Sequence, residues 1–229
     1  MNELSLAQIG FSIRNQVRGY FSSDDERIDI ELIYKKVRDV RSLLIKSFYR
    51  ENKFIGPEMY QEICCLEIQC RQLECNGIKT GEIEYFIELP RLETSVGFAA
   101  IKFLGSADKK LSFTRKSWQG YMFGDSSPWT GNKPFYTIVG DEARIRKLPT
   151  TGAKYACLIG LLEDPLDGKC YMLSENDPYP ISNNMVHELE LIVIKQLMST
   201  LQIPPDQRNN ATDAPVIDQP VVNPNAINK

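Results

Sequence analysis

The stretch "NDPYPISNNMVHELELIVIKQLMSTLQ", residues 176–202, decides the fold because it predicts a long helix that is apolar around most of its circumference. Its two prolines favour an extended chain before the helix, and Ser182, Asn183 or Asn184 can cap the first turn. The helical spacing of apolar residues continues almost to the end of the stretch. We therefore expect a helix over 182–201.

The apolar residues of this helix form two neighbouring stripes at about 100° per residue. The first stripe consists of Val186, Leu189, Val193 and Leu197. The second stripe consists of Leu191, Ile194, Met198 and Leu201. A surface helix needs a single apolar face only a little more than about 100° wide. We therefore expect one face to pack on a sheet and the other to meet the N-terminal helices or a neighbouring subunit. The second stripe is a candidate partner interface.

The N-terminal residues predict a hairpin of two helices. Apolar residues recur at helical spacing after Ser5, and Gln8 completes a capping box with that serine. Ser23 and Glu26 form a second capping box, where a longer helix is expected to begin. The apolar stripe of this second helix consists of Ile30, Ile33, Val37, Val40, Leu44 and Phe48.

Lys35, Arg38 and Arg41 belong to a basic run on the later half of that second helix. Charge runs on amphipathic helices are most often solvated. The alternative is that these three residues contact DNA or an acidic partner surface. The chain as a whole has 27 basic and 30 acidic residues, a formal charge of -3, so its net charge does not attract nucleic acid. Any DNA contact has to be local.

The middle of the chain favours strands that are separated by Gly, Pro and Asp. The sequence therefore predicts an α+β fold in four parts. These are an N-terminal helical hairpin (1–55), a β-rich core forming an antiparallel sheet or small sandwich (56–181), a long C-terminal helix packing on that core (182–201) and an extended tail (202–229).

Four of the six cysteines crowd into "CCLEIQCRQLEC", residues 64–75, which suggests a metal site. The alternation of apolar and polar residues predicts a strand instead, in which Cys65 and Cys75 lie roughly 33 Å apart. The chain has a single histidine, His187, and no C-x-x-C pair. We expect no metal. We also expect reduced, packed cysteines without disulfides in a protein kept in the cytosol.

No motif assembles a catalytic site or a cofactor site. "GDSS", residues 124–127, is a weak match to a GDSL-type esterase block, with His187 as its only candidate base. "NGIKTG" lacks the spacing of a phosphate-binding loop. No stretch approaches the roughly 20 apolar residues that span a bilayer. We therefore expect no enzyme, no cofactor and no membrane partner.

The C-terminal tail from Leu201 onward contains five prolines and no aromatic residue. Such a segment buries too little apolar surface to order itself. We expect it to be held by a partner chain, with Ile217 and Val221 as candidate contacts.

The order of these segments resembles that of a known family. A helical hairpin is followed by the Cys-containing strand, by "PFYTIVGDEARIRKLP", by a strand ending in "LLEDP" and by "DPYPIS" leading into "MVHELELIVIKQLM". Over residues 30–200 this resembles the ring proteins of the head-to-tail connector, or neck, in crAss-like and related tailed bacteriophages. The last segment carries most of the resemblance.

The resemblance implies a structural virion protein that forms a cyclic homo-oligomer, twelvefold like the portal that it would extend. Its implied partners are itself, the portal protein, other connector ring proteins or tail proteins, with packaged DNA passing close by. Its implied location is the virion neck, and the host cytoplasm during assembly. The alternatives are a small cytosolic hydrolase-like enzyme and a monomeric adaptor with a flexible tail.

Overall fold

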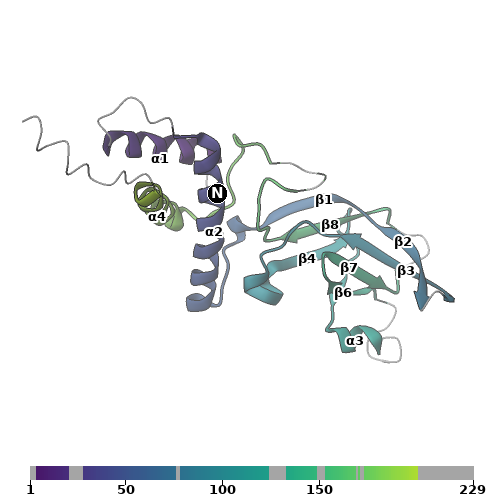
Figure 1. Cartoon of the computed structure of the whole chain (residues 1–229). Coiled ribbons are helices and arrows are strands. Elements are labelled where there is room, and N and C mark those ends of the chain that lie inside the picture. Colours follow the sequence, from purple (N-terminus) through teal and green to yellow (C-terminus); the bar gives the residue numbers. More distant parts are fainter. Residues whose placement is uncertain are drawn as a thin grey trace, which may run out of the picture.

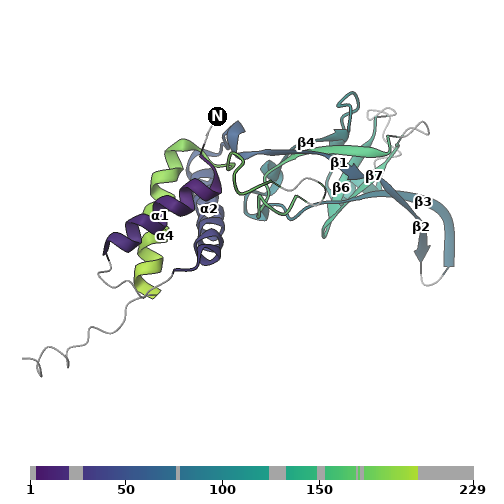
Figure 2. The same ribbon diagram turned by 90° about the horizontal axis from the view of Figure 1, so that it is seen from above.

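A computed structural model describes the protein at residues 4–20, 28–75, 78–123, 133–148, 153–168, 170 and 173–200. A bundle of helices lies at one end of the molecule and a β-rich part at the other (Figures 1 and 2). The confirmed class is α+β, with helices at the N-terminus, mainly antiparallel sheets, and a helix that follows them. The tail from residue 201 onward lies outside the described residues.

The bundle consists of α1 (Leu6–Tyr20), α2 (Ile30–Asn52) and α4 (Asn183–Thr200). The capping box before α1 is confirmed: the Gln8 N–H donates to Ser5 Oγ at 3.2 Å and the Ser5 N–H donates to Gln8 Oε1 at 3.0 Å. The start of α2 differs from the prediction. Asp29 caps it by accepting from the Glu31 N–H, whereas the Ser23–Glu26 box lies outside the described residues.

The C-terminal helix packs on the other helices rather than on a sheet. Val186, Leu189, Val193 and Leu197 lie in one apolar core with the buried faces of α1 and α2. Close approach within the bundle is possible because Gly10 of α1 faces the Tyr34 ring of α2. The expected contact with the N-terminal helices is confirmed, whereas the expected contact with a sheet needs correction, because the buried residues of α4 belong to the bundle core and none belongs to the core of the β-rich part. No helix in the described part of the chain is both long and apolar enough to cross a membrane.

The β-rich part contains two sheets. A three-stranded sheet has the order β1 (Gln61–Glu67), β8 (Tyr155–Gly160), β4 (Ile101–Ser106). A five-stranded sheet has the order β2 (Gln69–Cys75), β3 (Ile78–Glu88), β7 (Glu142–Arg146), β6 (Phe135–Val139), β5 (Thr114–Arg115). Every pair of neighbouring strands is antiparallel except β5 and β6. A short helix η1 (Pro57–Met59) precedes β1, and the short helices η2 (Thr94–Ala100) and α3 (Trp118–Met122) lie between strands.

A second apolar core lies between the two sheets. It takes Ile63, Leu104 and Leu158 from the smaller sheet and Ile87 and Ile145 from the larger one. The stretch that was predicted as a single strand passes from one sheet to the other at this point. It breaks between β1 and β2, where the Ile68 N–H donates to the Lys154 carbonyl at 2.9 Å.

Candidate assembly surfaces

The hairpin of β2 and β3 stands away from the rest of the protein. We call residues 69–75 and 78–84 of this hairpin the arm. In the part of the chain that the structure describes, β2 pairs with β3 alone, and β3 pairs with β7 at Tyr85–Glu88. The arm therefore has no third strand beside it in the described part of the chain. It curves away from the body at the end opposite the helical bundle (Figure 2).

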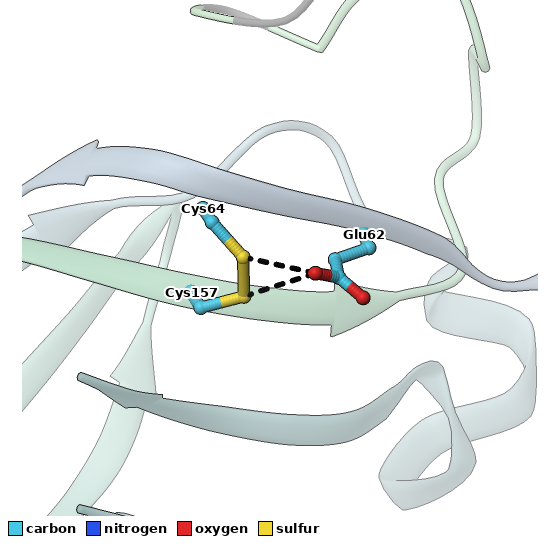
Figure 3. Close-up of side chains that lie close together, drawn as sticks. All are labelled: Glu62, Cys64 and Cys157. Atoms are coloured by element: carbon cyan, nitrogen blue, oxygen red, sulfur yellow. Dashed lines mark hydrogen bonds between the residues drawn. A yellow bond between two sulfur atoms is a disulfide. The ribbon is translucent and has the colours of Figure 1, made fainter. Parts of the chain in front are cut away.

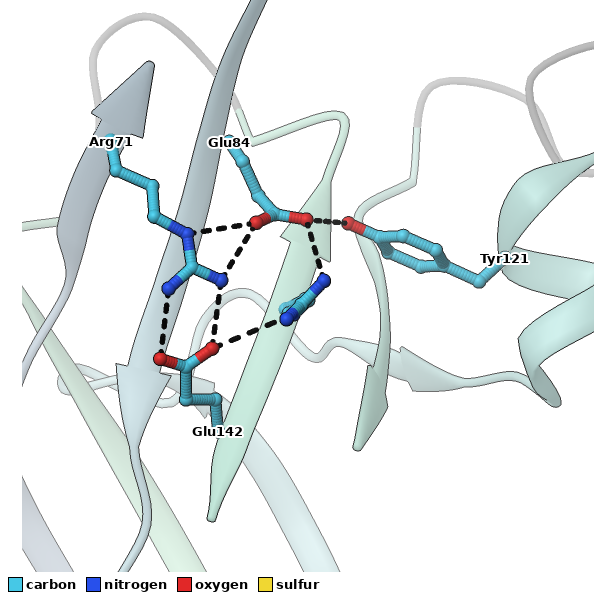
Figure 4. Close-up of polar contacts among 5 residues, drawn as sticks. Arg71, Glu84, Tyr121 and Glu142 are labelled. Atoms are coloured by element: carbon cyan, nitrogen blue, oxygen red, sulfur yellow. Dashed lines mark hydrogen bonds and ion pairs between the residues drawn. The ribbon is translucent and has the colours of Figure 1, made fainter. Parts of the chain in front are cut away.

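A network of charged side chains, which we call the joint, fixes the base of the arm (Figure 4). Arg71 of β2 donates from Nε and Nη2 to Glu84 Oε2 at 3.1 and 2.9 Å. The same guanidinium donates from Nη1 and Nη2 to the two oxygens of Glu142 on β7 at 2.9 and 2.8 Å. Tyr121 of α3 donates to Glu84 Oε1 at 3.4 Å, and Arg144 Nη1 lies 3.8 Å from the same oxygen. The joint thus connects β2, β3, β7 and α3.

The joint is partly buried, and its charges are held in place. Glu84 is only 6% exposed, while Arg71 is 36% exposed and also lies over the Phe86 ring at 4.5 Å. The hydrogen bonds from Arg71 hold the pKa of Glu142 below its usual value. Burial, followed by the charge of Glu84, raises the pKa of Tyr121. These two pKa shifts keep the Glu142 carboxylate charged and the Tyr121 phenol protonated at neutral pH. Fixed protonation states suit a structural connection rather than proton transfer.

The predicted interface residues on α4 fall into different environments. Leu191 is 52% exposed, whereas Ile194 is buried in the bundle core and Met198 packs against that core. Leu201, Ile217 and Val221 lie outside the described residues. Much of the second apolar stripe is therefore already covered by the chain's own helices, and Leu191 is its most exposed described member.

The three basic residues Lys35, Arg38 and Arg41 of α2 also lie in different environments. Lys35 is exposed, and Arg38 Nη1 lies 2.5 Å from Asp164 Oδ2 in an ion pair. The hollow beside them has four acidic and three basic side chains in its lining, contributed by Asp39, Glu163, Asp164 and Asp167 and by Lys35, Arg38 and Arg91. This surface is mixed in charge, so it is not the basic patch that the helix sequence alone predicts.

Arg41 is fully buried, which corrects its assignment to a solvent-facing or DNA-facing surface. Its Nε donates to the Pro180 carbonyl at 2.8 Å and its Nη1 to the Leu162 carbonyl at 2.9 Å. Its Nη2 donates to the Met59 carbonyl at 3.4 Å, and the guanidinium lies 5.8 Å from the Tyr179 ring centre. Burial lowers the pKa of Arg41. Arg41 therefore ties α2 to both connections between the bundle and the β-rich part, through Met59 between α2 and β1 and through Leu162 and Pro180 between β8 and α4.

The cysteines are arranged differently from the prediction. Disulfides join Cys64 to Cys157 and Cys65 to Cys170, because the pairing of β1 with β8 brings the first two face to face. Glu62 Oε1 lies 3.2 Å from Cys64 Sγ and 4.0 Å from Cys157 Sγ (Figure 3). The expectation of reduced cysteines was therefore wrong.

The group of Glu62, Cys64 and Cys157 has the residue types of a metal site, but its sulfur atoms are joined to each other. The form of cysteine that binds a metal is the thiolate, which a disulfide does not offer. Glu62 is instead paired with Lys109, whose Nζ lies 2.6 Å from Glu62 Oε1 at a half-exposed position. The arrangement fits a cross-link between strands.

The structure does not assemble the esterase-like residues. His187 is exposed near the start of α4, and residues 124–127 lie outside the described residues. A cavity of about 340 Å³ lies between η2 and the turn that joins β6 to β7. Its described lining has no serine, cysteine, histidine or lysine, and it consists mainly of apolar residues together with Thr94, Arg91, Arg115, Asp141 and Glu163. This lining therefore does not supply the serine and histidine of the esterase-like pattern.

Comparison with known families agrees with a role in assembly. The family model described as phage tail ring protein 2 matches residues 8–219, which include the bundle, both sheets, the arm and part of the tail. A search of the curated proteins finds no match. Because the family match covers nearly the whole chain, the chain belongs to the phage tail ring protein 2 family, a family of ring proteins of crAss-like bacteriophages.

Proposed function

We propose that this chain forms a closed ring of identical subunits in the head-to-tail connector of a virion. The observation that carries the proposal is the family match over residues 8–219. The shape supports it, because a cyclic ring needs two different surfaces on each subunit, one for each neighbour. The bundle and the arm, at opposite ends of an elongated molecule, provide two such different surfaces (Figure 2).

The proposed ring is twelvefold and lies between the portal and the tail. A ring with the twelvefold symmetry of a portal allows each subunit to make the same contact with the ring above or below it. The proposed partners are the portal protein and other connector or tail proteins, and the ring surrounds the DNA channel. The mixed charge of the hollow near Lys35 and Arg38 suits such a channel, because DNA can pass it without being held by a strong basic patch.

Oligomeric mass tests this proposal against the two alternatives. We expect native mass spectrometry of the purified chain and a reconstruction of the particle that contains it to show one closed oligomer, twelvefold in the particle. A monomer in both measurements would support an adaptor instead. A hydrolytic activity that is lost in His187→Ala would support an enzyme.

The tail is expected to contribute to assembly but not to the stability of the folded chain. Truncation after Gln202 removes a segment without aromatic residues or apolar periodicity, yet the family match extends into it as far as residue 219. We expect the free energy of unfolding of the isolated chain to change by less than about 0.5 kcal/mol. We expect association to weaken at least about tenfold, because an extended segment makes many small contacts along its length.

Thermal melting and native mass spectrometry of the same preparation separate these two effects. Ile217→Ala and Val221→Ala serve as controls, and each is expected to weaken association much less than the truncation. A truncated chain that melts at a lower temperature but assembles normally would show that the tail packs on its own subunit.

A further inference from the structure

We propose that the arm docks on the body of the neighbouring copy of this chain and so closes the ring. This inference rests on the proposed ring function. The part of the arm that contacts the neighbour is its outer face, which includes Cys70, Gln72 and Ile83. The partner is a second copy of the chain, reached in one direction around the ring.

The first argument is the incomplete sheet. Among the strands that the structure describes, residues 78–84 of β3 pair with β2 alone, and the outer edge of β2 pairs with none. A two-stranded hairpin is at best marginally stable in water, and an open strand edge is a site for further association. A contact with another chain supplies the packing that the arm lacks within its own subunit.

The second argument is the difference between the two faces of the arm. Residues directly opposite each other on antiparallel strands share a face, so Cys70, Gln72 and Ile83 of the arm lie on the same face as Tyr85 at its base. Tyr85 packs against the core between the two sheets, and the outer face is the part of this surface beyond it. The opposite face carries Arg71 and Glu84, whose charges are used in the joint. The outer face is therefore uncharged at Cys70, Gln72 and Ile83, and Ile83 is 62% exposed.

The third argument is the fixed direction of the arm. The joint holds β2 and β3 to β7 and α3 through several hydrogen bonds and ion pairs (Figure 4). An arm with a fixed direction loses little conformational freedom when it binds, so its binding costs less free energy. A contact between one subunit's arm and the next subunit's body is also head-to-tail, as closed rings with cyclic symmetry require.

A substitution at the most exposed apolar position of the arm tests the proposal. We expect Ile83→Asp to raise the concentration needed for ring formation at least about tenfold. We expect its melting temperature as an unassembled subunit to stay within about 2 °C of the parent value, because the side chain is exposed. Leu43→Asp on α2 is the matched control for folding, since Leu43 is 58% exposed, and we expect its melting temperature to stay equally close to the parent value.

The outcomes separate this inference from the ring function itself. A parent chain that forms rings, with no loss of assembly in Ile83→Asp, would overturn the role of the arm and leave the ring intact. A parent chain that is monomeric in solution and in the particle would overturn the ring function first.

Cys70 provides a second test that needs no destabilising change. It is an exposed, free cysteine on the outer face of the arm. We expect a maleimide reagent to label it at least about tenfold more slowly in assembled rings than in dissociated subunits, because the docked arm shields it. Cys70→Ser identifies the labelling that comes from this site. Equal labelling rates in rings and subunits would show that the outer face points to solvent in the ring.

Discussion

Val193→Asp is expected to unfold the helical bundle. Val193 has no exposed surface and lies in the middle of α4, within the apolar core that α4 shares with α1 and α2. An aspartate there has no buried partner, and burying an unpaired carboxylate costs several kcal/mol, roughly the whole stability of an ordinary domain. Chemical denaturation followed by circular dichroism should therefore show either an unfolded chain or a loss of at least about 3 kcal/mol.

Leu191→Asp is the matched control for this change. The two positions lie on the same helix, but Leu191 is 52% exposed, so a carboxylate at that position stays hydrated. We expect its free energy of unfolding to change by less than about 0.5 kcal/mol. A Val193→Asp chain as stable as the Leu191→Asp chain would mean that α4 is placed wrongly. Loss of assembly in Leu191→Asp alone would instead support the predicted interface on this stripe.

The helices were the most predictable part of the fold, because their signals are local. The Ser5–Gln8 capping box and the apolar stripe of α2 depend only on neighbours in the sequence, and both agree with the structure. The unusually wide apolar surface of α4 was also visible in the sequence. The sequence also predicted its contact with the N-terminal helices, but it wrongly added a contact with a sheet, because a stripe of apolar residues packs equally well on a sheet or on two other helices.

The arm and its joint could not be predicted, because they depend on contacts between distant residues. Arg71 and Glu142 are separated by 71 positions, and nothing near either residue indicates the other. The two cysteines of each disulfide are 93 and 105 positions apart in the sequence, so the cysteine cluster does not indicate which cysteines it pairs with. The break between β1 and β2 at Ile68 was hidden because alternation of polar and apolar residues continues across it.

The burial of Arg41, unlike the arm and the disulfides, could have been predicted from the sequence. Its position on the helix indicated burial, but the residue was assigned to the surface because of its charge. It lies four residues after Val37 and three before Leu44, both of which belong to the apolar stripe of α2. An arginine within an apolar stripe points toward the core, where it must meet hydrogen-bond acceptors. Helical position should therefore be weighed before charge when basic residues on an amphipathic helix are assigned to a nucleic acid.

Arg41→Ala is expected to cost about 3–5 kcal/mol of stability, comparable with the loss of one partner from a buried charged pair. The change removes the donors to the carbonyls of Met59, Leu162 and Pro180, and it leaves these acceptors buried. Arg41→Lys keeps the charge but not the planar fork that serves three acceptors at once, so we expect a smaller but substantial loss. Lys35→Ala at an exposed position on the same helix should change stability by less than about 0.5 kcal/mol.

Denaturation of the three variants under identical conditions tests this ranking. An Arg41→Ala chain that is as stable as Lys35→Ala would show that the guanidinium does not connect the bundle with the β-rich part. The ranking also decides how a DNA contact has to be tested. Because Arg41 acts through folding, a particle that loses DNA when Arg41 is replaced gives no information about a DNA-binding surface. Only substitutions at Lys35 and Arg38, with Arg41 left in place, address that surface.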